Sequence, residues 1–524
     1  MFDGVTSSTA AEAAPLRPVP SPPRPTRPSL LRHRPSLTRW LAAGPAAAAA
    51  AAARSMGLTP NRELLAVALA YLVQGVKIRA AGLAESYLLK DALHLSPAAV
   101  TSLLSIAHVP WVVKPLYGFI SDNFPIGGER RRPYLVGCGL LGSLAFWCLG
   151  SGGFTSLTPV SACILITASE LAVAFSDVVV DAVVVEQARG ESQAAAGALQ
   201  SLCWGAQAVG SLSSAWAAGW LIQVAGPRPV LAAMAAFPLL VAVAAGFIRE
   251  VPRAPPATAP GSPSTAAAAA AAPPTSLAAK LTAIGAQARS LAATLARPDI
   301  LGPAAFIWAY HASPSPGAAL FFFYSEPAAS GGLGFSPEFI GRIALLDGLA
   351  SLGGVWLFNA HLRKVPLRRI FVGVTWAGAA AGLTQLVLVT RLNLVLGLSD
   401  KLFVAGDSVL LTALGRVALM PCLVLAARIC PPGVEGSLFA ALMSLSNAGG
   451  GAGELIGAAL TARLGVRAGA FQGLPALVAI CAVASLAPLA LVGLVGKAGA
   501  AADEGGGKED AEAGAEEEGR RGSA

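Results

Sequence analysis

The chain has 524 residues, of which 55% are hydrophobic and only 13% are charged, and its net charge is +8. Soluble proteins are about 25% charged, so this composition excludes an ordinary soluble globular protein and indicates one that crosses a membrane several times. The positive excess is typical of loops that stay on the non-translocated side of a membrane. No basic run is interleaved with aromatic residues, so we expect no binding to nucleic acid.

Residues 1–58 form a region that is rich in arginine, serine and proline and poor in acidic residues. This bias is typical of transit peptides that direct proteins to organelles. We therefore predict a disordered N-terminal region that serves as a transit peptide. The alternative that the residues leave open is a disordered basic tail.

Two sets of six apolar segments follow, each long enough to cross a bilayer, since an α-helical span needs about 20 residues. In the first set the expected spans are 62–89, 97–121, 132–151, 159–188, 192–224 and 229–248. In the second set they are 300–325, 336–360, 368–390, 397–427, 435–464 and 469–496. We predict an all-α membrane protein with twelve transmembrane helices in two six-helix bundles, at residues 59–249 and 299–496.

The two bundles are separated by residues 250–298, whose Pro-, Ala- and Ser-rich sequence predicts a flexible central linker. Residues 497–524 are rich in Gly, Ala and acids, which predicts a disordered acidic tail. This outline is that of a duplicated transporter. When Arg189 is aligned with Arg428, Asp177 falls opposite Arg416, so the halves place opposite charges at one depth.

Ionisable residues inside the spans are expensive to bury in a bilayer and are therefore candidates for function. The first span holds Lys77, Arg79 and Glu85, and the fourth holds Glu170, Asp177 and Asp181. The three acids are spaced by seven and four residues, so they share one face of the helix. Further candidates to bind a substrate are Trp204 in the fifth span, Tyr324 in the seventh and Arg416 in the tenth.

Charged residues gather in the first and fourth spans of each half, whereas the interiors of the third, sixth and twelfth spans have none. By the helical rise of about 1.5 Å per residue, Asp177, Arg416, Lys77 and Arg79 converge near the middle of the bilayer. Substrate sites of duplicated transporters lie at that depth. The alternative is that these charges only neutralise one another and hold the bundles together.

The stretch "WVVKPLYGFISDNFPIGGERRRPYL" joins the second and third spans. It carries Lys114 in its apolar part, followed by Gly118, Asp122 and Arg130–Arg132 at the membrane face. We interpret Asp122 and the arginines as a gate that latches the bundles in one access state. The alternative is a basic loop that only sets the orientation in the membrane. Two roles are open for Lys114: its side chain extends to the membrane surface, or it pairs with an acid of the fourth span, for which Asp181 lies at a similar depth.

The eleventh span contains "NAGGGAGELIG", in which Gly449, Gly453 and Gly457 lie four residues apart, a spacing typical of closely packed helices. The seven cysteines show no CxxC spacing and the five histidines form no ligand motif, so we expect no metal and no cofactor. The sequence has no nucleophile elbow, zinc motif or phosphate loop, so we expect that the protein is not an enzyme.

The glycine, acid and basic cluster at Gly118, Asp122 and Arg130–Arg132 resemble the signature loop of the major facilitator superfamily. The fuller strings "KPLYGFISDNFPIGGERRRPYL", "SDVVVDAVVVEQAR" and "CPPGVEGSLFAALMSLSN" resemble the folate–biopterin transporter family of that superfamily. The resemblance implies the major facilitator fold, alternating access and a cavity lined by the first and fourth helices of each half. It also implies folates, pterins or related metabolites as substrates, and the plastid envelope of plants or algae as the location. We expect a monomer.

On this resemblance, we expect Asp177 and Asp181 to accept the N–H edge of a pterin ring. Lys77, Arg79 and Arg416 are then the candidates to bind substrate carboxylates, because a guanidinium binds a carboxylate in bidentate fashion.

Trp204 and Tyr324 are the candidate stacking faces for the ring. Because burial disfavours an ionised carboxylate, Asp181 or Glu170 is a candidate to carry a coupling proton. Two alternatives remain: a major facilitator carrier for a different organic anion or sugar, and a non-transporting membrane receptor or scaffold.

Overall fold

A computed structural model of the chain describes residues 61–151, 157–188, 193–248, 250, 277–362, 365–430 and 435–495. Within these ranges the chain forms helices and two isolated β-bridges, and no strand is present. The predicted transit peptide at 1–58 and acidic tail at 497–524 lie outside the described residues. The all-α prediction is confirmed.

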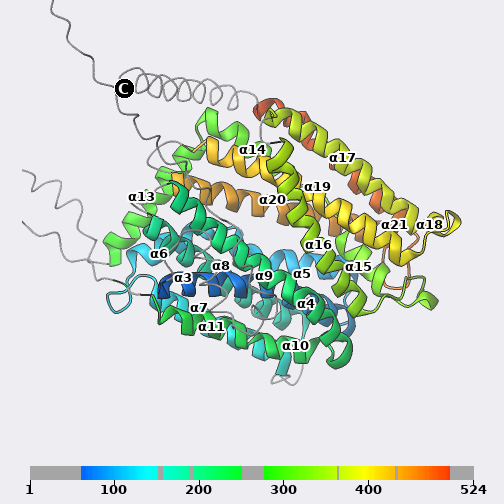
Figure 1. Ribbon diagram of the computed structural model, residues 1–524, viewed down its shortest axis with the longest axis horizontal. Helices are drawn as coiled ribbons and strands as arrows, with labels where there is room; N and C mark the ends of the chain where they lie inside the picture. The colour runs from blue at the N-terminus through cyan, green and yellow to red at the C-terminus, as the bar shows by residue number, and fades with distance from the viewer. Residues whose placement is uncertain are drawn as a thin grey trace, which may run out of the picture. The chain divides into compact units, whose positions relative to one another are not determined.

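The N-terminal half consists of helices that follow the predicted spans closely (Figure 1). The first span combines α3 (Arg62–Val76), η1 (Lys77–Ala81), α4 (Gly82–Tyr87) and η2 (Leu88–Ala92). The second combines α5 (Pro97–Ala107), η3 (Val109–Trp111) and α6 (Lys114–Asn123). The others are α7 (Arg132–Ser151), α8 (Pro159–Ala188), α9 (Gln193–Ala225), and α10 (Pro227–Met234) with α11 (Ala236–Ala245).

The C-terminal half repeats this plan (Figure 1). Its first two spans are α14 (Pro298–His311) with α15 (Gly317–Ser325), and α16 (Pro337–Leu357) with η5 (Phe358–Leu362). They are followed by α17 (Leu367–Val389), α18 (Leu392–Val395), α19 (Asp400–Arg428), α20 (Glu435–Arg463), and α21 (Leu474–Ala484) with η6 (Ala487–Leu491). The short helix η4 (Ala328–Ser330) lies between the first two spans.

Of the predicted flexible linker at residues 250–298, residues 251–276 lie outside the described residues, and the end of the range is helical. Helix α13 spans Leu277–Leu295, and its sequence is rich in Ala and Leu, contains no proline and holds one glycine. These residues have high helix propensity, so the Pro-rich composition that predicts a linker applies only to the part before them. Helix α13 packs against α6 and α14.

Nine helical segments of the described chain are long and apolar enough to cross a membrane. The other three expected spans coincide with α9, with α14 and α15, and with α20. The break between α14 and α15 falls at the sequence "SPSPG", where proline interrupts a helix, and α20 carries the glycine run of the eleventh span. The count of twelve stays a prediction.

Two irregularities in the spans position charged residues. Lys77 and Arg79 lie in η1, a π-helical turn that widens the first span, and such turns are frequent at functional sites. In the second span Pro110 lies in η3, and α6 then restarts at Lys114 with Pro115 in its first turn, where proline is well tolerated. Lys114 therefore lies at a helix start inside the span.

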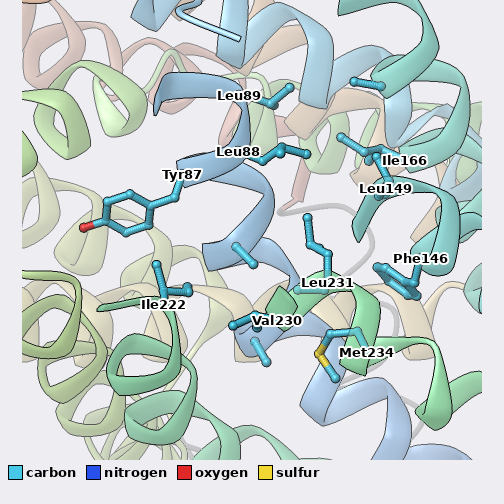
Figure 2. Close-up of a cluster of buried hydrophobic side chains, with 14 of the residues drawn as sticks. Tyr87, Leu88, Leu89, Phe146, Leu149, Ile166, Ile222, Val230, Leu231 and Met234 are labelled. Carbon is cyan, nitrogen blue, oxygen red and sulfur yellow. The ribbon is translucent and has the colours of Figure 1, made fainter. Parts of the chain in front are cut away.

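A cluster of buried apolar side chains fixes the end of the first span against its neighbours (Figure 2). It joins Tyr87, Leu88 and Leu89 to side chains of α7, α8, α9 and α10. Within this cluster Leu88, Leu89 and Leu231 are fully buried. We call the end of the bundles where η2 and α15 finish the far end. The opposite end, where α3 begins and α6 leads into α7, is the near end.

The two halves meet mainly where α9 packs on α16 and where α5 packs on α20. A side chain on Gly219 would collide with the backbone of Pro337 and Gly341, so these helices cross in direct backbone contact. Within the C-terminal half, Gly449, Gly453 and Gly457 likewise lie against the backbone of Trp308, Ser313 and Ser315, at the end of α14 and the following turn.

Candidate functional site

The acid Glu170 lies at the centre of a buried polar group in the N-terminal half. Its side chain is 1% exposed, and it forms an ion pair with Lys77 of η1. The indole Nε1 of Trp111 donates a hydrogen bond of 2.8 Å to its second oxygen, Oε2. Because the ammonium of Lys77 is committed to this buried carboxylate, the structure does not support the prediction that Lys77 binds a substrate carboxylate.

Asp177 and Asp181 lie one helical turn apart on α8, on the face that the sequence predicts. Asp177 forms an ion pair with Lys114, and the hydroxyl of Tyr71 donates a hydrogen bond to Asp181. Lys114 and Asp177 also interact electrostatically with Asp181. The prediction of an acid of the fourth span as partner of Lys114 is confirmed, but that partner is Asp177 rather than Asp181.

Two arginines from opposite halves lie near each other. Arg79 of η1 interacts electrostatically with Arg416 of α19 and with Asp347 of α16. Both arginines are half-buried, and neither forms a hydrogen bond or an ion pair within the described part of the chain. The alignment of the two halves places Arg416 and Asp177 at the same depth in the membrane. They are not paired, because Asp177 binds Lys114.

The C-terminal half contributes acids that bind hydroxyl groups. Ser408 donates a hydrogen bond of 2.6 Å to Asp347, and Thr384 donates one to Asp407. Tyr324 interacts electrostatically with both acids and packs against the ring of Phe335. Asp347 was missed in the sequence, although the rule that ionisable residues in a span are candidates applies to it equally.

Trp204 of α9 stands apart from this set. Its side chain is 58% exposed, and among the described residues no ring contact or hydrogen bond involves it. The structure therefore does not bring Trp204 together with the other candidate stacking residue, Tyr324.

At the near end, Arg131 of the signature loop binds acids of α6 and α8. Its Nη2 lies 2.8 Å from an oxygen of Asp122 and 3.0 Å from one of Glu186, and its Nη1 donates a hydrogen bond of 2.9 Å to Ser121. All of these partners belong to the N-terminal half. Within the described chain, Arg131 is thus a link between α6, α7 and α8, and a latch between the bundles stays a prediction.

The backbone of the same loop is held by Glu250, which follows the sixth span. Its carboxylate accepts hydrogen bonds from the N–H groups of Arg130, Arg131 and Arg132. These groups precede or begin α7, where N–H donors lack partners within the helix and the helix dipole favours an anion. A Cβ atom added at Gly118 would lie in ordinary contact with Val178 of α8, so the packing there leaves room for a small side chain.

The far end holds a charged contact between the two halves. Lys90 of η2 forms an ion pair of 2.9 Å with Glu326, at the end of α15, and one of 2.8 Å with Asp91. The Lys90 ammonium also lies 5.6 Å from the centre of the Phe322 ring. Nearer the middle, Asn447 of α20 donates a hydrogen bond of 3.0 Å to the carbonyl of Trp111.

Within the described ranges, His, Cys, Asp and Glu form no group of three that could hold a metal ion. The described residues of the site are ion pairs, acids that accept hydrogen bonds from hydroxyl groups, and the two arginines. It can bind a solute that combines anionic groups with polar N–H groups.

The chain is similar in sequence to known proteins. The sequence matches the BT1 family over residues 74–513. It is 41% identical over 423 residues to the folate-biopterin transporter of Synechocystis, covering 81% of this chain and 79% of that protein. It is 30% identical over 453 residues to the probable folate-biopterin transporter 4 of Arabidopsis thaliana, covering 78% and 90%.

Among solved structures, the nucleoside transporter NupG is similar at a TM-score of 0.56 and 12% sequence identity, covering 83% of this chain and 98% of NupG. At this level of identity the likeness shows the fold, which is that of the major facilitator transporters.

Proposed function

The chain belongs to the BT1 family, and from this membership we propose that it is a secondary-active membrane transporter of folates, pterins or related metabolites that works by alternating access. The relatives at 41% and 30% identity carry the names of folate-biopterin transporters. The observation that carries the proposal is the group of unlike charges that both halves contribute to the middle of the bundles.

Arg79 and Arg416 are the groups that we assign to substrate carboxylates. Two like charges that lie near each other in a partly desolvated space repel, and an anion between them removes that repulsion. Folates carry carboxylates on their glutamate, and a guanidinium binds a carboxylate in bidentate fashion. This assignment needs one arginine from each half, so binding of the substrate draws the two halves together.

Asp177 and Asp181 are assigned to the N–H edge of the pterin ring. Among the described residues, Asp177 is bound by Lys114 and Asp181 by Tyr71, and a carboxylate has room for further hydrogen bonds. Tyr324 is the candidate to stack on the ring, because it interacts electrostatically with the acids Asp347 and Asp407 of the C-terminal half. Trp204 has no support in the structure for this role.

Alternating access is proposed from the way the halves contact each other. The pair Lys90–Glu326 and the crossing of Gly219 with Gly341 tie the halves toward the far end. We propose that these ties break when the far side opens, and that the signature loop around Asp122 and Arg131 closes the near side. A coupling proton is part of this proposal.

The location is proposed as the plastid envelope, on the basis of the arginine- and serine-rich sequence of residues 1–58 and of the plant relative. A fluorescent fusion at the C-terminus of the full chain tests it by its position relative to chlorophyll fluorescence. Fluorescence from another membrane would contradict the plastid location and leave the transport proposal untouched.

Transport is tested with the full chain reconstituted in proteoliposomes. We expect saturable uptake of labelled folate that unlabelled folates and pterins inhibit and that sugars do not. Saturable uptake inhibited by sugars or by unrelated organic anions instead would identify a carrier for a different solute. The absence of saturable flux for every solute would favour a receptor or scaffold.

A further inference from the structure

A second group of ionisable side chains lies at the junction of the first span, α5 and α8, and the proposed substrate contacts leave it unused. It contains Glu85 of α4, which is 2% exposed. Its Oε1 atom is buried and has no hydrogen-bond partner within the described chain. A buried carboxylate oxygen without a hydrogen-bond partner destabilises the fold. It therefore points to a ligand that the described residues do not supply.

The charges around Glu85 do not balance when every acid is ionised. Lys77 interacts electrostatically with both Glu85 and Glu170, and its ammonium forms the ion pair with Glu170. One cation thus faces two buried carboxylates. A single proton on Glu85 makes this group neutral, and loss of that proton leaves one uncompensated buried negative charge, which is strongly disfavoured.

His108 connects this buried group to the region where the halves meet. Its Nδ1 lies 2.9 Å from the carbonyl oxygen of Leu104, and because a carbonyl oxygen only accepts, Nδ1 carries a hydrogen. Its Nε2 lies 3.4 Å from Oε1 of Glu170. A second proton, bound at Nε2, turns this contact into an ion pair, and the 56% exposed side chain leaves the ring open to proton exchange.

The opposite half faces the same histidine. Glu454 of α20 interacts electrostatically with His108, and Asn447 of the same helix binds the carbonyl of Trp111, three residues after His108. Protonated His108 therefore attracts one acid of each half, whereas neutral His108 attracts neither. The protonation of His108 thus changes the strength of the contact between α20 and the second span.

We propose that Glu85 and His108, linked by Glu170, form the binding site for the proton that this transporter moves with its substrate. The proton passes from water to Nε2 of His108, then to Oε1 of Glu170 and on to Glu85, and only N–H and O–H bonds change. The charged and titratable groups that face these three residues are Lys77 on η1 and Glu454 on α20, and Cys481 of α21 faces Glu454. This inference rests on the proposed transport function, which it deepens by assigning the coupling ion to named residues.

The proton site can be tested without any substrate. Infrared difference spectra between acid and alkaline pH, recorded on the full chain in an ester-free detergent, report the carbonyl band of a protonated carboxylic acid. We expect a band that Glu85→Gln removes, since glutamine keeps the shape of the protonated acid and cannot release a proton. The matched control Asp299→Asn, at an exposed acid, keeps the band. The same band in wild type and Glu85→Gln would overturn the assignment.

Coupling is tested by comparing two modes of folate flux in proteoliposomes with the membrane potential clamped. With an acidic exterior we expect wild type to accumulate labelled folate up to about tenfold for each pH unit of gradient, as one proton per substrate allows. Glu85→Gln and His108→Gln lose this accumulation but keep exchange of labelled for unlabelled folate at equal pH. Accumulation by Glu85→Gln at the level of wild type would contradict the proposal.

The two measurements separate this inference from the transport proposal. If wild type moves no folate in either mode, the proposed substrate is wrong, and the infrared band still decides whether Glu85 binds a proton. If folate exchanges normally and the band is insensitive to Glu85→Gln, the substrate proposal stands and the proton site is wrong.

Discussion

The two halves of the molecule handle their buried acids in different ways. In the N-terminal half, Glu170 and Asp177 each form an ion pair with a lysine of the same half. In the C-terminal half, Asp347 and Asp407 accept hydrogen bonds from hydroxyl groups, and the cation Arg416 forms no ion pair with a described residue. The buried acids of the N-terminal half are therefore paired with lysines and those of the C-terminal half with hydroxyl groups, whereas Arg79 and Arg416, one from each half, form no ion pair with a described residue.

This difference separates charges that hold the fold together from charges that are available to a solute. A buried lysine bound to a buried acid cannot leave it without exposing an uncompensated charge. An arginine near another arginine is stabilised by an anion from outside the chain. We therefore expect removal of the N-terminal lysines to affect stability and removal of Arg416 to affect transport.

The largest effect on stability is expected for Lys77→Ala. It leaves the ionised Glu170 buried without its cation, which costs about 3–5 kcal/mol of the free energy of unfolding. The temperature of unfolding in detergent measures the loss. The double variant Lys77→Met with Glu170→Gln removes both charges and should recover most of the stability. Equal unfolding temperatures for the single and the double variant would show that the pair is not the cause.

A smaller effect is expected for Tyr71→Phe, which removes the hydroxyl that donates to Asp181. A hydrogen bond to a charged group contributes about 1.5–3 kcal/mol, against about 0.5–1.5 kcal/mol for one between neutral groups. Tyr117→Phe is the matched control, because its hydroxyl donates to the neutral carbonyl of Pro110. Unfolding temperatures that fall less for Tyr71→Phe than for Tyr117→Phe would show that the hydrogen bond to Asp181 contributes no more than one between neutral groups.

The smallest effect is expected at the exposed pair of Arg297 and Asp299. The hydrogen bond from Arg297 lowers the pKa of Asp299 below its usual value, so the pair stabilises the fold at neutral pH and loses this contribution as the pH falls through that lowered pKa. Because both side chains are largely exposed, solvent screens the pair, and we expect Asp299→Asn to unfold at the temperature of wild type. A clear loss at neutral pH would show that exposed pairs also support this fold.

Much of the helical framework could be predicted from the sequence, because apolar stretches long enough to cross a bilayer indicate transmembrane helices. The span from 132 to 151 and the expected start of the span at 435 agree with α7 and α20 as they are found. The break in the second span follows from Pro110 and Pro115, which disfavour a continuous helix. Helix α13 was missed because the Pro-rich composition before it was extended too far.

The sequence predicts which residues belong to the candidate site better than it predicts which of them pair with one another. The spacing of Glu170, Asp177 and Asp181 fixes a common face of α8, but it does not fix which helix faces each acid. The expected depth in the membrane placed Asp177 opposite Arg416. The partner of Asp177 depends instead on the rotation of α6, which places Lys114 beside it. The roles of His108 and Glu85 also depend on such packing, which no local pattern encodes.

The proposal that Arg416, together with Arg79, binds the carboxylates of the substrate is tested most directly by Arg416→Gln, with uptake of labelled folate compared with uptake of a labelled pterin that has no carboxylate. Loss of charge-assisted hydrogen bonds of about 1.5–3 kcal/mol predicts a fall of roughly 10- to 100-fold in folate uptake at low concentration. Pterin uptake should stay at the wild-type level, as should both uptakes in the exposed control Arg228→Gln. Equal uptake of folate by wild type and Arg416→Gln would contradict the claim.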